Sequence, residues 1–168
     1  MLRRVDPGRG CSIKDSFASI DFSPDGFRPL FEAEWIHRRA VQHDAEDGLN
    51  WIAVRTADEL RAWGSAHGGG EIFRRALLDD PAVAILAAYD GDTVVAGVIG
   101  NRSDTVVGLS NLFTTTADPD QIWAGAVSAL SARFPGLPLV GYEHGPSLQA
   151  AHRAGFFSVG PLRVWLKD

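Results

Sequence analysis

Leu137-Pro-Leu-Val-Gly-Tyr-Glu143 has the apolar composition of a short strand and begins the most informative third of the chain. It is followed by Pro146-Ser-Leu-Gln-Ala-Ala-His-Arg-Ala154, which has the composition of a helix, and Gly155-Phe156 ends that helix. A last apolar run finishes on Pro161-Leu-Arg-Val-Trp-Leu166. The chain is therefore expected to close with a strand, a helix and a strand.

Upstream of this ending, the sequence predicts an antiparallel meander of three strands over residues 83–89, 93–100 and 105–113, with Asp90-Gly-Asp92 as one of its turns. A helix over 118–134 follows, with Asp at its cap and Pro at its first position. A helix-length crossover returns the chain to the same edge of a sheet. The strands before and after this helix should therefore lie parallel if they are neighbours.

The N-terminal part is expected to divide into an arm and the start of the domain. Residues 1–26 are rich in Gly, Pro, Ser and Asp and predict an irregular arm, whereas residues 27–168 should form a single domain. Residues 27–39 alternate apolar and polar side chains, as a half-buried strand does, and the polar stretch 42–48 ends this strand. A second strand over 49–54 would complete an additional N-terminal strand pair.

Two helices are expected between this pair and the meander. Thr56-Ala-Asp-Glu59 is a capping box, in which the Thr hydroxyl and the Glu carboxylate each satisfy a free amide at the helix start. Leu60 and Trp63 then share one helical face, and a short second helix is expected over 71–78. The complete order of elements predicts an α+β fold, with a mixed, mostly antiparallel twisted sheet flanked by helices.

Composition and charge narrow the classes of function. The chain has 168 residues and a net charge of −5, and its 16 Lys and Arg are dispersed, so the basic patch of a nucleic-acid-binding protein is missing. No apolar run approaches the roughly 18 residues that span a membrane, and the N-terminus lacks the apolar core of a signal peptide. Cys11, the one cysteine, fits a reducing compartment. We expect a cytoplasmic protein that binds neither nucleic acid nor membrane.

The strand order of residues 55–166, with Gly155-Phe156 closing the last helix, resembles the GCN5-related N-acetyltransferase superfamily. The resemblance implies an acyl-CoA N-acyltransferase fold and transfer of an acetyl or other acyl group from acyl-CoA to an amine, on a small molecule or a peptide. In that family the cofactor lies where the strands equivalent to 105–113 and 137–143 splay apart, with its diphosphate on the helix between them. The resemblance therefore implies cofactor contacts from Leu112, Phe113, Thr114, Gln121 and Ile122.

The chain departs from the family pattern at the diphosphate loop. Where family members carry a glycine-rich loop, residues 114–123 contain no glycine and place Asp118, Pro119 and Asp120 at the helix start. Free amides and the positive end of the helix dipole bind phosphate. The carboxylates of Asp118 and Asp120 each interact with the helix dipole by ~0.3–1 kcal/mol, and Pro119 removes one amide donor. These groups therefore oppose the binding of a dianionic ligand there. The loop argues against acetyl-CoA bound in the family's usual way.

Two further positions differ from the family pattern. The family often has a Tyr four residues before the glycine, as general acid toward the departing thiolate, and this chain has Ala151. The family commonly has an Asn that contacts the pantetheine arm, and this chain has His144. Two functions stay open: an acyltransferase, and a non-catalytic domain of the same fold that binds another small molecule or a protein segment.

Glu143 and His144 are the candidate catalytic residues, because they end a strand beside the expected crevice. Imidazole titrates near neutral pH without tuning, and a carboxyl does so when burial raises its pKa, so either group could deprotonate an amine. Successive residues of a strand face opposite sides, so Tyr142 and His144 should share one face and Glu143 the other. The alternative is a solvated histidine in a turn and a paired glutamate.

Three residues are candidate substrate contacts. Glu34 and Trp35 alternate on the first predicted strand, and Asn111 is a polar residue among apolar neighbours on the strand that would line the crevice. The alternatives are core packing for Trp35 and a backbone hydrogen bond at a bulge for Asn111.

Metal binding is not expected, because the histidines are scattered and no His-x-Glu, His-Glu-x-x-His or Cys-x-x-Cys spacing occurs. An exposed sheet edge needs covering, and a homodimer with two-fold symmetry would cover it. The sequence is compatible with such a dimer and does not specify the oligomeric state.

Overall fold

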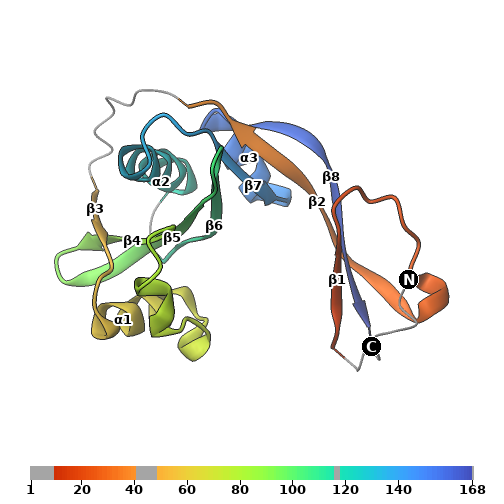
Figure 1. Ribbon diagram of the computed structural model, residues 1–168, viewed down its shortest axis with the longest axis horizontal. Coiled ribbons are helices and arrows are strands. Elements are labelled where there is room, and N and C mark those ends of the chain that lie inside the picture. The colour runs from red at the N-terminus through yellow and green to blue at the C-terminus, as the bar shows by residue number, and fades with distance from the viewer. Residues whose placement is uncertain (1–9, 41–48, 116–117, 168) are drawn as a thin grey trace.

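Figure 1 shows the computed structural model of the chain, which describes residues 10–40, 49–115 and 118–167. In this part of the chain the strands are β1 (Ser12–Asp15), β2 (Phe27–Arg38), β3 (Asn50–Ala53), β4 (Val83–Asp90), β5 (Thr93–Arg102), β6 (Val107–Thr114), β7 (Leu139–Glu143) and β8 (Phe157–Lys167). The helices are α1 (Ala57–His67), α2 (Pro119–Arg133) and α3 (Gly145–Arg153), with short 3-10 turns at Ser23–Asp25, Gly70–Ile72 and Arg75–Leu78.

The eight strands form one sheet in the order β1-β8-β2-β7-β6-β5-β4-β3. Only β6 and β7 are parallel, as the helical crossover between them predicts, and every other pair is antiparallel. The predicted α+β fold, with a mixed and mostly antiparallel sheet flanked by helices, is confirmed.

The two longer helices begin where the sequence predicts. At α1 the Thr56 hydroxyl accepts the backbone N–H of Glu59 at 3.2 Å, and the Glu59 carboxylate accepts the N–H of Thr56 at 3.0 Å. Gly68, with a φ of 80°, ends this helix in the left-handed conformation that glycine adopts without strain. At α2 the Asp118 carboxylate accepts the N–H of Asp120 at 3.0 Å.

The helices lie on both faces of the sheet: α2 and α3 pack on one face and α1 on the other (Figure 1). The core under α2 and α3 includes Ile36, Leu109 and Leu130. The core under α1 is centred on Trp63, which has no exposed surface. Each face of the central strands is therefore covered by a helix, as a layered α+β domain requires.

β2 occupies an unexpected place, between the last two strands of the chain (Figure 1). Its residues 27–37 pair with β8, and residues 34–38 also pair with β7. The predicted pairing of β2 with β3 is wrong, because β3 lies at the far edge of the sheet against β4. Apolar alternation fixes which face of a strand is buried, and it does not fix which strand becomes the neighbour.

The predicted irregular arm contains a strand in its described part, because β1 pairs with β8. Asp15, at the end of β1, is buried, and its carboxylate accepts two backbone N–H groups of the residues that follow. The short helix predicted over 71–78 is instead two separate 3-10 turns. Residues 1–9 of the arm and the predicted polar stretch 42–48 lie outside the described residues.

Candidate functional site

β6 and β7 diverge soon after they begin to pair. Their parallel register ends with Gly108 opposite Val140. Three residues further along β6, Asn111 has a left-handed backbone with a φ of 52°, at an irregularity in the pairing of β6 with β5. Its side-chain amide donates to the hydroxyl of Ser110 at 3.2 Å. A bulge bends its strand, and here it directs the end of β6 away from β7.

A cavity of about 190 Å³ lies between the diverging ends of these strands. Its wall combines the end of β6, the first turns of α2 and α3, and the end of β7: Leu112, Phe113, Thr114, Pro119, Ile122, Trp123, Glu143 and Ser147. Four of the five predicted cofactor contacts thus lie together here. Neither Gln121 nor Asn111 belongs to the wall. A mostly apolar wall with a few polar groups is typical of a small-molecule site.

Glu143 is the carboxylic acid of this wall. It is half-buried at the end of β7, and burial raises the pKa of its carboxyl from 4.5 to about 7, although the backbone N–H of His144 acts in the opposite direction. Near neutral pH the side chain is therefore present in both protonation states. A group in that condition can accept a proton from a ligand and release it again.

His144 lies on the opposite face of the sheet from Glu143. Its exposed ring stacks on Phe31, with 4.8 Å between the ring centroids. Tyr142 shares this face, where its ring meets that of Trp35 edge-on at 5.6 Å. The alternation of side chains predicted along β7 is confirmed, and the structure does not bring the two candidate catalytic residues together.

The same alternation separates two of the candidate substrate residues. In the ladder between β2 and β7, Glu34 stands opposite Glu143, and Trp35 stands opposite Tyr142. Glu34 therefore shares the α2 and α3 face with Glu143, although it does not line the cavity. Trp35 lies on the other face.

The start of α2 is held by α3 through Arg153, a residue that the sequence analysis missed. The guanidinium donates two hydrogen bonds of 2.7 Å to the carboxylate of Asp120, and this pairing lowers the pKa of that carboxyl. Arg153 follows Asp120 by 33 positions, so no local pattern could reveal the contact. Residues 116–117 of the predicted glycine-free loop lie outside the described residues.

Burial of Glu143 should make the stability of the protein depend on pH. The folded protein holds this proton more tightly than the unfolded chain, so the free energy of unfolding should fall as the pH rises from 4.5 through about 7. Glu143→Gln removes the cost of ionisation. After allowance for solvent screening, it should stabilise the protein by about 1–2 kcal/mol at pH 8.5.

The measurement is thermal unfolding of both proteins at two pH values. We expect the variant to melt a few degrees higher than the wild type at pH 8.5, and the two melting temperatures to coincide at pH 4. Equal melting temperatures at both pH values would show that the Glu143 carboxyl titrates normally.

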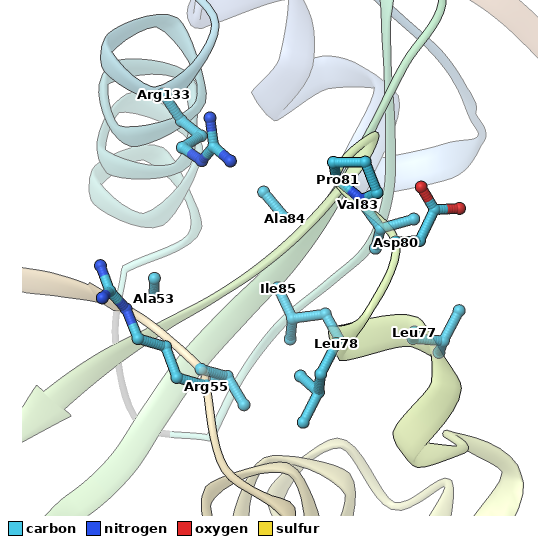
Figure 2. A pocket seen from close by; sticks show the side chains of 11 residues that line it. Ala53, Arg55, Leu77, Leu78, Asp80, Pro81, Val83, Ala84, Ile85 and Arg133 are labelled. Atoms are coloured by element: carbon cyan, nitrogen blue, oxygen red, sulfur yellow. The ribbon is translucent and has the colours of Figure 1, made fainter.

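A second cavity, of about 230 Å³, lies at the far edge of the sheet (Figure 2). Figure 2 shows Arg133, at the end of α2, and Arg55, after β3, with Ala53 between them in the view and Asp80 across the cavity. None of the predicted site residues lines it, and the neighbouring strands β3 and β4 stay paired from Asn50 to Ala53. The cavity beside Glu143 is therefore the better candidate for chemistry.

The described residues contain no group of three or more His, Cys, Asp or Glu side chains placed to hold a metal ion. The His37 and His67 rings each lie against an aromatic ring, and His43 is outside the described residues. Among the helices of the described segments, none has both the length and the apolar character that crossing a membrane requires.

Several solved structures share this architecture. A functionally unknown conserved protein from Staphylococcus epidermidis superposes with a TM-score of 0.69 at 12% identity, over 94% of this chain and 71% of its own. A GCN5-related N-acetyltransferase from Kribbella flavida superposes with a TM-score of 0.64 at 12% identity, over 88% of this chain and 62% of its own. A GCN5-related N-acetyltransferase from Sphaerobacter thermophilus also superposes with a TM-score of 0.64 at 12% identity, over 95% of this chain and 60% of its own.

The likeness lies in the fold and not in the sequence. No protein-family model matches this chain, and no curated protein sequence does. The chain spans less than two thirds of the Kribbella and Sphaerobacter proteins. What it shares with them is the overall arrangement of strands and helices that these superpositions compare. This chain has the fold of the GCN5-related N-acetyltransferases.

Proposed function

We propose that this protein transfers an acyl group from an acyl-CoA to an amine, with Glu143 as the general base. The observation that carries the proposal is a half-buried carboxyl with a pKa of about 7 in the wall of the cavity between β6 and β7. A primary amine is mostly protonated at neutral pH and must lose a proton before it can form an amide. A carboxylate that exchanges its proton near pH 7 suits that step.

The remainder of the cavity suits the acyl end of the cofactor. Leu112, Ile122 and Trp123 would exclude water from the reacting groups. Beyond Gly108 the backbone of β6 has no ladder partner on β7, so its polar groups can meet a carbonyl or amide of a ligand. Acyl-CoA supplies the activated acyl group, as a thioester.

The start of α2 suits the diphosphate of the cofactor poorly. Asp118 already occupies the free amide of Asp120, and Asp120 adds a second carboxylate, compensated by Arg153. Ala151, at the position where the family often has its general acid, is fully buried and packs α3 against the sheet. These observations favour a second function, a non-catalytic domain that binds another small molecule or a protein segment in the same cavity.

Thermal unfolding with and without acetyl-CoA tests the proposal. A ligand at a hundred times its dissociation constant should stabilise the folded protein by ~2.7 kcal/mol and raise the melting temperature by several degrees. Acetyl-pantetheine, which lacks the diphosphate, should give a similar shift at its own saturation, because the thioester end makes the contacts with the cavity.

Two variants on α3 locate the binding site. Ser147 is an exposed residue of the cavity wall, so Ser147→Trp should fill the cavity and abolish the shift. Gln149 is exposed on the same helix and lies outside the wall, so Gln149→Trp should keep the shift. The absence of any shift with the wild-type protein, or an equal shift in Ser147→Trp, would contradict the proposal and favour the non-catalytic domain.

A further inference from the structure

An aromatic pair lies on the face of the sheet opposite the Glu143 side chain. Trp35 on β2 and Tyr142 on β7 are both half-buried, and their rings meet edge-on at 5.6 Å with an interplanar angle of 79°. The indole N–H of Trp35 donates to the backbone oxygen of Ser16 at 2.9 Å, which ties the end of β1 to β2. The two rings are thereby fixed relative to each other and to the N-terminal strand.

The ammonium of Lys14 occupies this aromatic pair. Its Nζ atom lies 4.0 Å from the ring centroid of Tyr142 and 6.0 Å from that of Trp35. Ion pairs among the described residues join Arg61 to Asp58, Arg153 to Asp120 and Arg163 to Glu32, and Lys14 takes part in none of these three. Among the described residues, the contacts found for the Lys14 ammonium are with the faces of these two rings. A cation over an aromatic face is stabilised by the ring quadrupole.

The contact is open to exchange. The Lys14 side chain is exposed, so solvent reaches its ammonium and little surface must be uncovered when it leaves. Lysine is flexible, and β1 keeps its pairing with β8 through backbone groups that do not depend on the side chain. A second ammonium could therefore replace that of Lys14 without rearrangement of the sheet.

We propose that the Trp35–Tyr142 pair is a recognition site for a primary alkylammonium, and that Lys14 is a tethered occupant that such a ligand displaces. Charge and geometry both support an ammonium ligand: the protein carries a net charge of −5, and the pair already holds an ammonium at 4.0 Å. A neutral ligand of the same shape would lack the attraction to the ring faces.

The position of the pair connects it to the cavity. Tyr142 immediately precedes Glu143, at the end of β7 that diverges from β6. Phe113, which also lines the cavity, packs on Trp63 under α1, on the face of the sheet opposite α2 and α3. If the proposed acyl transfer is correct, and only then, the alkylammonium bound here is the acceptor on its way to the acyl group. Binding of the ammonium to the aromatic pair does not depend on that function.

The test is a titration of ¹⁵N-labelled protein with n-butylammonium chloride at constant ionic strength, followed at the indole N–H signal of Trp35. The signal is assigned with Trp35→Phe. In Lys14→Met, which keeps an unbranched side chain of similar length and removes its charge, we expect the dissociation constant to be about tenfold lower than in the wild type, because the tethered competitor is gone. n-Butanol should leave the signal unchanged in both proteins.

Two further variants serve as controls. Lys167→Met removes the other lysine of the chain, whose Nζ lies 5.4 Å from the Phe27 ring, and it should bind n-butylammonium as the wild type does. Lys14→Met combined with Tyr142→Leu should bind it at least fivefold more weakly than Lys14→Met alone. Equal affinity in Lys14→Met and wild type, or an equal response to n-butanol, would overturn the proposal.

The stabilisation by acetyl-CoA, measured on the same variants, separates the two proposals. Binding of n-butylammonium without a rise in melting temperature on addition of acetyl-CoA would contradict the acyltransferase proposal and support the recognition site. An acetyl-CoA shift without ammonium binding at Trp35 would do the reverse.

Discussion

Glu143→Gln should lower the rate of acyl transfer by ~10²–10⁴-fold, the usual contribution of a general base. Glutamine has nearly the same shape as glutamate and cannot accept the proton of the amine. In the wild type the rate should rise with pH through about 7, because the ionised carboxylate is the active form and the pKa of Glu143 is about 7. The variant should lose that dependence.

The measurement is thiol release from acetyl-CoA over a panel of primary amines, between pH 5.5 and 9. Glu32→Gln is the matched control: it makes the same change on the α2 and α3 face of β2, where Glu32 pairs with Arg163 at 2.6 Å outside the cavity wall. Its rate and its pH profile should match those of the wild type. A rate within threefold of wild type for Glu143→Gln would remove Glu143 from the mechanism and leave the base unassigned.

Trp63→Ala should lower the free energy of unfolding by ~3–5 kcal/mol, the range for large aromatic side chains in a core. Trp63 has no exposed surface, and its indole N–H donates to the backbone oxygen of Leu86 at 2.9 Å. Its ring also contacts those of Phe73 at 4.8 Å and Phe113 at 5.1 Å. Alanine would leave a cavity under α1 and a carbonyl oxygen without its donor.

Urea unfolding of the wild type, Trp63→Ala and Trp63→Phe checks this expectation. Trp63→Phe keeps most of the packing and loses the hydrogen bond, so it should cost ~1–3 kcal/mol, less than Trp63→Ala. Because Phe113 also lines the cavity, Trp63→Ala should weaken acetyl-CoA binding as well. A loss below ~1 kcal/mol for Trp63→Ala would mean that α1 contributes little to the stability of the sheet.

Much of the fold could be predicted because the groups that form it are near each other in the chain. The Thr56 and Glu59 cap, the Asp118 cap and the meander from β4 to β6 all depend on contacts between close neighbours. The parallel pairing of β6 with β7 follows from the length of the helix between them. These are rules of geometry over short segments, and one sequence is enough to apply them.

The partners of distant segments could not be predicted in this way. β2 joins β7 and β8 although more than 100 residues separate them, and the predicted pair of β2 with β3 does not form. Arg153 compensates Asp120 across 33 positions, and Lys14 reaches Tyr142 from the N-terminal strand. No local signal marks these contacts, since each depends on how the whole sheet is ordered.

For the candidate site, the sequence alone established which residues stand at the end of β7 and that Glu143 and His144 point to opposite faces. This holds because side chains alternate along any strand, whatever surrounds it. The tertiary structure supplied the rest: the cavity beside Glu143, the rise of its pKa to about 7, and the aromatic pair under Lys14. Burial arises only when segments far apart in the chain pack together, and burial is what changes the chemistry of this carboxyl.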